Sequence, residues 1–239
     1  VWRTTNGGLS WAVLTDNLSN LRVWSLTIDP VQSSTYYWGA NSGVIFKSTD
    51  SGSTWNVLAD IGSGNVNKII VDPTNTNKMY CSAEGGGIFK SSNAGISWSI
   101  IHPNANNGYD VEFKPGNTSV VYASGNSVFI SSDDGISFTD LDTAFSNGPK
   151  MIGVATGASD NNAQSVVYVL EAASGLFNEI YKSTDSGLTF SPINTESKNY
   201  FGYDSDGDDD LGQAPRDMDI VVSSANTDDV FLSFIHFTE

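Results

Sequence analysis

Apolar residues occur along the chain in short runs, and each run is closed by a polar or glycine-rich turn. The stretch 66–101 shows the pattern in full, because apolar strands are expected there at 66–71, 78–83, 88–91 and 97–101. An Asp-Pro turn, a Gly-Gly-Gly turn and an octet of small polar residues separate these strands. Four short strands joined by tight turns indicate an antiparallel, all-β unit.

The polar octet recurs along the chain at a nearly constant distance. Its third position is occupied in turn by Asn6, Asp50, Asn93, Asp133 and Asp185. These positions are 44, 43, 40 and 52 residues apart, which is the spacing of a four-stranded propeller blade of roughly 40–50 residues. A second marker, Asp-Pro or Lys-Pro at 29–30, 72–73 and 114–115, runs in phase with the octets. The two markers together predict a repeat protein.

The residue types of the octet suit a hairpin turn. An Asp or Asn accepts hydrogen bonds from nearby backbone N–H groups, hydroxyl groups add further local bonds, and the glycine at position five is able to adopt positive φ. The eighth position is aromatic in every copy: Trp11, Trp55, Trp98, Phe138 and Phe190. We expect this ring to anchor the hairpin in its blade, and we interpret the octet as a structural element without ligand chemistry.

The pattern S-x-D-x-G-x-T-W, preceded by a strand that ends in Lys, resembles the Asp-box or BNR repeat. That repeat occurs in sialidases, in xyloglucan-degrading glycoside hydrolases and in sortilin-type receptor propellers, and the Asp-Pro turn brings the chain nearest to the last two. The lysines are preceded by aromatic residues at Phe46-Lys47, Phe89-Lys90 and Tyr181-Lys182. The resemblance implies a β-propeller of four-stranded antiparallel blades with an octet between the third and fourth strand. Enzymes and non-enzymes share the repeat, so the resemblance implies no reaction.

The repeat divides the chain, treated as one propeller region over 1–239, into blades. Complete blades are expected at 22–58, 65–101, 108–141 and 149–193, partial blades at 1–15 and 217–239, and a long insertion at 194–216. An open blade edge has to be covered or paired. We therefore expect a segment of a larger propeller, of about seven blades or more, in which other blades or domains of the same polypeptide close the ring.

Charge and composition exclude several kinds of partner. The chain carries 27 acidic and 11 basic residues, a formal net charge of −16, whereas nucleic acids and anionic membranes require clustered Lys and Arg. No stretch approaches the roughly 20 apolar residues of a membrane span. Cys81 is the single cysteine and lies in an apolar run, so it is expected to pack. With the family resemblance, this favours a secreted or cell-surface protein.

The insertion at 194–216 departs from the repeat, and long loops on a rigid scaffold often bind ligands. Three aromatic residues, Tyr200, Phe201 and Tyr203, are able either to stack on a sugar ring or peptide side chain or to pin the loop to its blade. Carboxylates alternate at Asp204, Asp206, Asp208 and Asp210, a pattern that resembles oxygen-rich Ca²⁺ loops. A solvated acidic loop is the alternative, since Pro215 stands where a twelve-residue calcium loop would place its bidentate Glu.

Three acidic residues near the starts of inner strands are candidates for glycoside hydrolysis: Asp110, Asp217 and Asp219. Glycosidases require two carboxyl groups roughly 5–9.5 Å apart, and the sequence does not fix that separation. Sialidases of the same repeat class clamp their substrate with three arginines. The chain has Arg3, Arg22 and Arg216, but Arg3 stands at the entry of an octet, where the other repeats have Lys, and so belongs to the face away from the channel. Sialidase activity is therefore disfavoured.

The sequence favours an extracellular propeller that presents loops for binding a glycan or a protein. The alternative is a glycoside hydrolase that acts on a β-linked polysaccharide, similar to the xyloglucanases. For that alternative, four aromatic residues either serve as platforms for sugar rings or pack between blades: Trp24, Tyr36, Tyr37 and Trp38.

Overall fold

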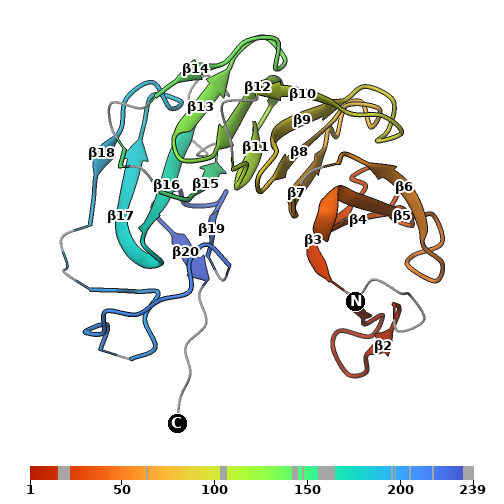
Figure 1. The fold of residues 1–239 in the computed structure, drawn as a ribbon, viewed down its shortest axis with the longest axis horizontal. Coiled ribbons are helices and arrows are strands. Elements are labelled where there is room, and N and C mark those ends of the chain that lie inside the picture. Colours follow the sequence, from red (N-terminus) through yellow and green to blue (C-terminus); the bar gives the residue numbers. More distant parts are fainter. Residues whose placement is uncertain are drawn as a thin grey trace. The chain divides into compact units, whose positions relative to one another are not determined.

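The structure is a computed structural model of the 239-residue chain. It describes residues 1–15, 22–62, 64–102, 107–141, 145–146, 148–155, 165–194, 196, 198–204, 206–216 and 218–233. The chain falls into two compact units, Val1–Pro103 and Asn104–Glu239 (Figure 1). All strand pairs in both units are antiparallel.

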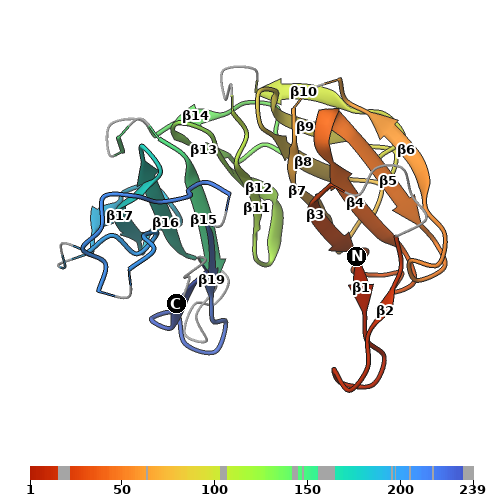
Figure 2. The ribbon, with the colours of Figure 1, turned by 60° about the horizontal axis from the view of Figure 1, so that its bottom comes forward.

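The first unit holds a hairpin and two four-stranded sheets (Figure 2). The hairpin pairs β1 (Trp2–Arg3) with β2 (Ala12–Val13). The first sheet consists of β3 (Val23–Ile28), β4 (Tyr36–Ala40), β5 (Val44–Ser48) and β6 (Asn56–Asp60), with the short 3₁₀ turn η1 (Asn41–Gly43) between β4 and β5. The second sheet consists of β7 (Val66–Val71), β8 (Met79–Ala83), β9 (Gly87–Ser91) and β10 (Ser99–His102). In each sheet every strand pairs with the next strand along the chain, as in a propeller blade.

The second unit holds two more four-stranded sheets and a strand pair. One sheet consists of β11 (Asp110–Lys114), β12 (Asn117–Ser124), β13 (Val128–Ser131) and β14 (Thr139–Asp140). The other consists of β15 (Lys150–Ala155), β16 (Val166–Ala173), β17 (Leu176–Ser183) and β18 (Ser191–Pro192), and the pair is β19 (Asp219–Val222) with β20 (Val230–Ser233). The expected all-β class with four-stranded antiparallel blades is confirmed. Among the described residues, no helix is long and apolar enough to cross a membrane.

The core of the first unit lies where β7 meets the sheet before it. Ile69 and Val71 pack with Tyr37 and Ile45 in one buried cluster. Trp38 is fully buried and stacks on the Phe46 ring at 4.6 Å between centroids. Both Tyr37 and Trp38 therefore pack inside the protein and are not sugar platforms. Trp24 and Tyr36 are half-buried.

The octets form hairpin turns held by local hydrogen bonds. In the octet 48–55, the Asp50 Oδ1 atom accepts the Thr54 N–H at 2.8 Å and the Thr54 hydroxyl donates to Oδ2 at 2.7 Å. The Gly52 N–H donates to Ser48 Oγ, and the Trp55 indole N–H donates to the Gly52 carbonyl. The backbone bond recurs at Asn93 and Asp133, whose Oδ1 atoms accept the N–H groups of Ser97 and Ser137. The side-chain and backbone bonds from Thr54 lower the pKa of Asp50 to about 2.

Two consecutive octet residues have positive φ, although the sequence indicates only the glycine. The fourth position is also left-handed, at 58° for Ser51 and 57° for Ala94. The glycine at position five has a second function, which is to leave space. A Cβ at Gly52 would come within 2.6 Å of Leu14, and one at Gly95 within 2.8 Å of Leu58. Position five therefore requires glycine for its φ, and at Gly52 and Gly95 also for the leucine that packs on it.

Candidate functional site

An open groove of about 430 Å³ lies in the second unit, between β17 and the connection 194–216. Its lining is mostly polar: Leu176, Phe177, Asn178, Glu179, Asn194, Glu196, Lys198 and Asn199. Amide groups, carboxylates and one ammonium group thus share a surface between a blade strand and the segment that breaks the repeat. We take this groove as the candidate site.

Asn199 attaches the connection to β17. Its Oδ1 atom accepts the N–H of Phe177 at 3.0 Å and the N–H of Phe201 at 3.2 Å. Its Nδ2 atom donates to the carbonyls of Asp209 at 3.2 Å and Leu211 at 2.7 Å. One side chain therefore holds the blade strand and both ends of the acidic turn, so the groove wall has a defined position.

The acidic turn closes on Asp209, a carboxylate outside the alternating series. Asp209 Oδ2 accepts the Tyr203 N–H at 2.6 Å. A Cβ at Gly202 would clash with the Asp209 carboxylate, which the Tyr203 N–H holds in place, so glycine suits this position. The alternating residues Asp204, Asp206, Asp208 and Asp210 are all exposed. Within the described ranges, no group of three or more His, Cys, Asp or Glu residues is arranged to hold a metal ion, and calcium binding stays a prediction.

The aromatic residues of the connection have different surroundings. Phe201 is 4% exposed and packs on the Phe177 ring at 5.8 Å between centroids, so it pins the connection to the blade. Tyr200 meets the same ring edge-on at 4.7 Å, and its hydroxyl donates to Glu196 Oε2 at 3.3 Å. Burial, together with the Glu196 charge, raises the pKa of Tyr200. Tyr203 is half-buried, which leaves Tyr200 and Tyr203 partly accessible to a ligand.

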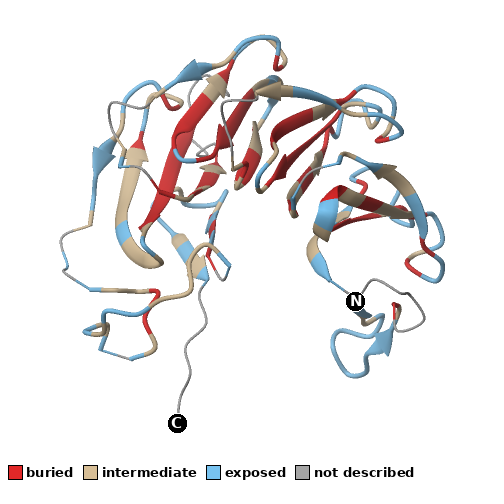
Figure 3. Ribbon diagram, in the orientation of Figure 1, coloured by how far each residue is buried: buried red, intermediate tan, exposed pale blue. Residues whose placement is uncertain are grey.

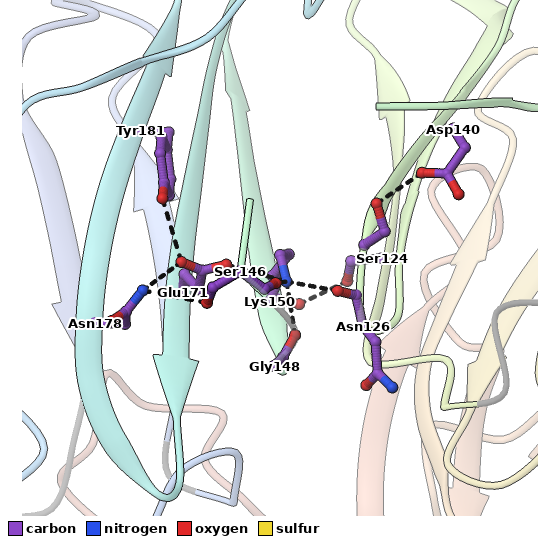
Figure 4. A network of polar contacts seen from close by, with 10 residues as sticks. Ser124, Asn126, Asp140, Ser146, Gly148, Lys150, Glu171, Asn178 and Tyr181 are labelled. Carbon is purple, nitrogen blue, oxygen red and sulfur yellow. Dashed lines mark hydrogen bonds and ion pairs between the residues drawn. The ribbon is translucent and has the colours of Figure 1, made fainter. Parts of the chain in front are cut away.

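A buried ion pair contacts Asn178, one of the residues that line the groove (Figure 4). Lys150 Nζ lies 3.1 Å from Glu171 Oε1, and both side chains are fully buried. The same ammonium group donates to three backbone carbonyls at 2.7–2.8 Å: Asn126, Ser146 and Gly148. Glu171 Oε2 accepts the Tyr181 hydroxyl at 3.3 Å, and burial, with the Glu171 charge, raises the pKa of Tyr181 to about 12. Buried charges persist only when they are paired and hydrogen-bonded in this way.

The ion pair also orients Asn178, which lines the groove and is exposed. Asn178 Nδ2 donates to Glu171 Oε2 at 2.5 Å and to Ser146 Oγ at 3.3 Å (Figure 4). Both amide hydrogens are thus used inside the protein. In the part of the chain that the structure describes, no donor meets the Asn178 carbonyl oxygen, so this oxygen is available to a ligand in the groove.

The ion pair was not predicted, although the sequence contains a signal for it. Lys150 begins an apolar strand, and Glu171 interrupts the apolar run 166–173. A charged residue within a run of buried positions predicts a buried partner of opposite charge. The sequence does not reveal which lysine and which carboxylate meet.

The described candidate catalytic acids do not line the groove, and each accepts hydrogen bonds from backbone N–H groups instead. Asp110 is 1% exposed, and its two oxygens accept the backbone N–H groups of Val111 and Ile152, each at 2.8 Å. It therefore joins β11 to β15. Asp219 is exposed and accepts the Ile220 N–H at 2.9 Å. Asp217 lies outside the described residues.

Comparison with known proteins gives a fold but no family. No family model matches the chain, and no curated protein matches it in sequence. Among solved structures, an ancestral GH74 enzyme (TM-score 0.71) and the GH74 enzyme of Niastella koreensis (TM-score 0.72) are each 19% identical. Each match covers 98% of this chain and 32% of the other. The fold is that of a β-propeller.

Two further matches agree on this fold. The GH74 xyloglucanase from Xanthomonas campestris has a TM-score of 0.67 at 14% identity, with 92% of this chain and 37% of that chain covered. YCF48 bound to D1 peptide has a TM-score of 0.54 at 11% identity, with 86% and 59% covered. The chain spans about a third of the length of the GH74 enzymes that it matches. At these identities the likeness shows the fold alone.

Proposed function

We propose that this chain is part of an extracellular or cell-surface β-propeller that binds a neutral glycan in the groove between β17 and the connection 194–216. The observation that carries the proposal is the free carbonyl oxygen of Asn178, held in place by the buried Glu171 and Lys150. A hydrogen-bond acceptor of the protein that is already fixed before binding loses little conformational entropy when the ligand binds. The proposal extends to a protein ligand only if the tests below favour one.

The groove chemistry suits sugar hydroxyl groups, which both donate and accept hydrogen bonds. Glu196 and Lys198 are more than half exposed and lie 3.6 Å apart, so an acceptor and a donor stand together on one wall. Glu179 Oε1 is occupied by the N–H groups of Ile180 and Asn194, which fixes the opposite wall. The formal charge of −16 opposes anionic glycans, and a neutral glycan avoids that repulsion.

Glycoside hydrolysis is the second candidate function, and the likeness to GH74 enzymes is the observation that favours it. In this proposal Asp219 or Asp217 supplies one carboxyl group. Asp110 is unsuited, since both of its oxygens are bound to backbone N–H groups.

The proposal is tested by calorimetric titration with a panel of neutral β-linked polysaccharides, xyloglucan included. Glu196→Gln and Lys198→Ala are each expected to weaken binding about tenfold, the effect of losing one hydrogen bond to a charged group. Asp204→Asn is the matched control, because Asp204 is exposed on the same connection but does not line the groove. Binding that neither groove variant alters, or no glycan binding at all, would refute the site.

The alternatives give different results in the same experiment. New reducing ends that disappear with Asp219→Asn would favour a hydrolase. Titration with peptides that bind where glycans do not would favour a protein ligand.

Calcium binding by the acidic turn has its own measurement. A metal that binds only the native state raises its stability, so millimolar Ca²⁺ is expected to raise the melting temperature and a chelator to lower it. Replacing Asp206 and Asp208 by Asn is expected to abolish the shift. A melting temperature that neither Ca²⁺ nor the chelator changes would contradict the calcium prediction for Asp204, Asp206, Asp208 and Asp210.

A further inference from the structure

The hairpin turn between β11 and β12 carries Asn117-Thr118-Ser119, a sequence of the type that accepts N-linked glycans. In both units the middle strands of the sheets are mostly buried and the turns are mostly exposed (Figure 3). Asn117 and Ser119 are both exposed, and Asn117 pairs with Lys114 at the end of the hairpin. The motif therefore lies on a surface turn, which is where a bulky hydrated glycan is tolerated.

The side chain of Asn117 is held by the same residue that supplies the hydroxyl of the motif. The Asn117 Oδ1 atom accepts the Ser119 N–H at 3.2 Å. Among the described residues, no acceptor meets the Asn117 Nδ2 atom and no partner meets the Ser119 hydroxyl. The nitrogen that would carry a glycan and the hydroxyl that the motif requires are therefore both available in the folded protein.

Two other blade turns contain an asparagine in the same geometry but without that hydroxyl. In the turn between β7 and β8, the Asn75 Oδ1 atom accepts the Asn77 N–H at 3.2 Å. In the turn between β19 and β20, the Asn226 Oδ1 atom accepts the Asp228 N–H, also at 3.2 Å. Asn75 and Asn226 are exposed. The three turns thus share one conformation, and of these three only the turn between β11 and β12 has a hydroxyl residue two positions after its asparagine.

The turn lies away from the groove within the second unit. Lys114, the strand partner of Asn117, donates from Nζ to Ser186 Oγ at 3.2 Å, and Ser186 belongs to the octet 183–190. This octet follows the end of β17, whereas the groove residues 176–179 form its start. Strand β17 has eight residues, so at about 3.3 Å per residue its two ends are roughly 20 Å apart. A glycan on Asn117 therefore leaves the groove open.

We propose that Asn117 is an acceptor for an N-linked glycan. The Asn117 Nδ2 atom attacks the anomeric carbon of an oligosaccharide carried on a polyprenyl pyrophosphate, in a reaction catalysed by a membrane-bound glycosyltransferase. A carbon–nitrogen bond forms and the nitrogen loses one proton. The bond from the anomeric carbon to the pyrophosphate oxygen breaks, and the polyprenyl pyrophosphate leaves with the electron pair. The assignment rests on the extracellular location proposed above, because such donors serve secreted proteins, but it does not rest on the groove or its ligand.

The experiment produces the chain with an added secretion leader in a eukaryotic host. Peptide-N-glycosidase converts each glycosylated Asn to Asp, so peptide mass spectrometry before and after this enzyme identifies the modified sites in secreted and cell-retained protein alike. Ser19→Ala is present throughout, because it removes the chain's other acceptor motif, Asn17-Leu18-Ser19, which lies outside the described residues. We expect a glycan on Asn117, its complete loss in Ser119→Ala and its retention in Ser119→Thr.

Asn77→Ser is the matched control, because it completes the acceptor motif at Asn75 in a turn of the same geometry. Asn77 is exposed, and its contact with Ala94 is made by its backbone carbonyl, which the substitution keeps. A second glycan is expected at Asn75 in this variant. The equivalent change at Asp228 is less suitable, since Asp228 pairs with Lys182.

An unmodified Asn117 would overturn the proposal whether or not Asn75 is modified in Asn77→Ser. Modification at Asn75 alone would show in addition that the turn between β11 and β12 itself prevents the transfer. Calorimetric titration of the glycosylated and the enzymatically deglycosylated protein with the same polysaccharide should give equal affinities. A failure of the groove proposal is thus measured separately from a failure at Asn117, and a weaker affinity of the glycosylated form would contradict the placement of the turn away from the groove.

Discussion

The octets and the connection 194–216 are both rich in polar residues, but they satisfy their polar groups over very different distances along the chain. In the octet 48–55 the carboxylate of Asp50 bonds to Thr54, four residues away. In the connection, Asn199 bonds to Phe177, twenty-two residues away, and Asp209 bonds back to Tyr203. A local network forms wherever its sequence occurs, whereas a long-range network forms only after the blade beneath it has folded. The octets therefore build the scaffold, and the connection depends on it.

The largest effect on stability is expected at the buried ion pair between Lys150 and Glu171, which contacts the groove residue Asn178. Lys150→Met leaves the buried Glu171 without its counter-charge and should lower the free energy of unfolding by about 3–5 kcal/mol. Urea denaturation measures this change. The matched control is Lys182→Met, because Lys182 pairs with the exposed Asp228 and should cost less than about 1 kcal/mol. Similar losses for the two variants would mean that burial of the pair is unimportant.

The next largest effect should come from the ring that pins the connection. Phe201→Ala removes a buried ring, and a loss of about 3 kcal/mol is expected, at the low end for such a change because the connection is able to undock by itself. Hydrogen exchange at the Phe177 N–H, which bonds to Asn199, reports the undocking directly. Tyr200→Phe keeps the ring contact and loses one hydroxyl bond, so it should leave that exchange rate nearly unchanged. Equal protection in Phe201→Ala and the natural protein would contradict the assigned role.

The same substitution should have opposite outcomes in the two regions. Asn199→Asp loses both donors to the carbonyls of Asp209 and Leu211, and a cost of about 2 kcal/mol is expected for acceptors left unpaired. Asn93→Asp retains the acceptor that binds the Ser97 N–H and resembles the octet of Asp50, so it should be tolerated. Thermal melting of the two variants side by side makes the comparison. A tolerated Asn199→Asp would show that the connection does not need its long-range bonds.

The smallest effect at neutral pH is expected for Asp50→Asn, which copies the octets of Asn6 and Asn93. In acid the difference should grow. The octet hydrogen bonds lower the folded-state pKa of Asp50 and Asp133 to about 2, below the ordinary value of 3.8. Such groups stabilise the protein above the unfolded-state pKa, and that stabilisation is lost as the pH falls from about 4 towards 2. Asp50→Asn should therefore lose less of its melting temperature over this range than the natural protein.

The difference between the two regions also explains what the sequence predicts and what it does not. The octets, their spacing and the antiparallel blades follow from short-range patterns, so the all-β propeller fold was predictable. The groove was not, because it depends on Asn199 meeting β17 and on Lys150 meeting Glu171, and neither partner is marked by spacing. The alternating aspartates lie in the connection 194–216, which also borders the groove. The carboxylate that holds the turn of this connection in place, however, is Asp209. Buried Tyr37 and Trp38 illustrate the same limit, since an aromatic residue on a strand has the same pattern whether it packs or binds.

The five octets of this single chain also constitute a natural record of tolerated substitutions. The third position alternates between Asp and Asn, and the fourth is occupied by Gly, Ser, Ala, Asp and again Ser, although it is left-handed. Only the fifth position is always glycine, which agrees with the leucines that pack on Gly52 and Gly95. Duplicated blades are therefore free to diverge at most octet positions. At Gly52 and Gly95 any larger side chain would have to displace the packed leucine, so these glycines are the octet positions least open to substitution.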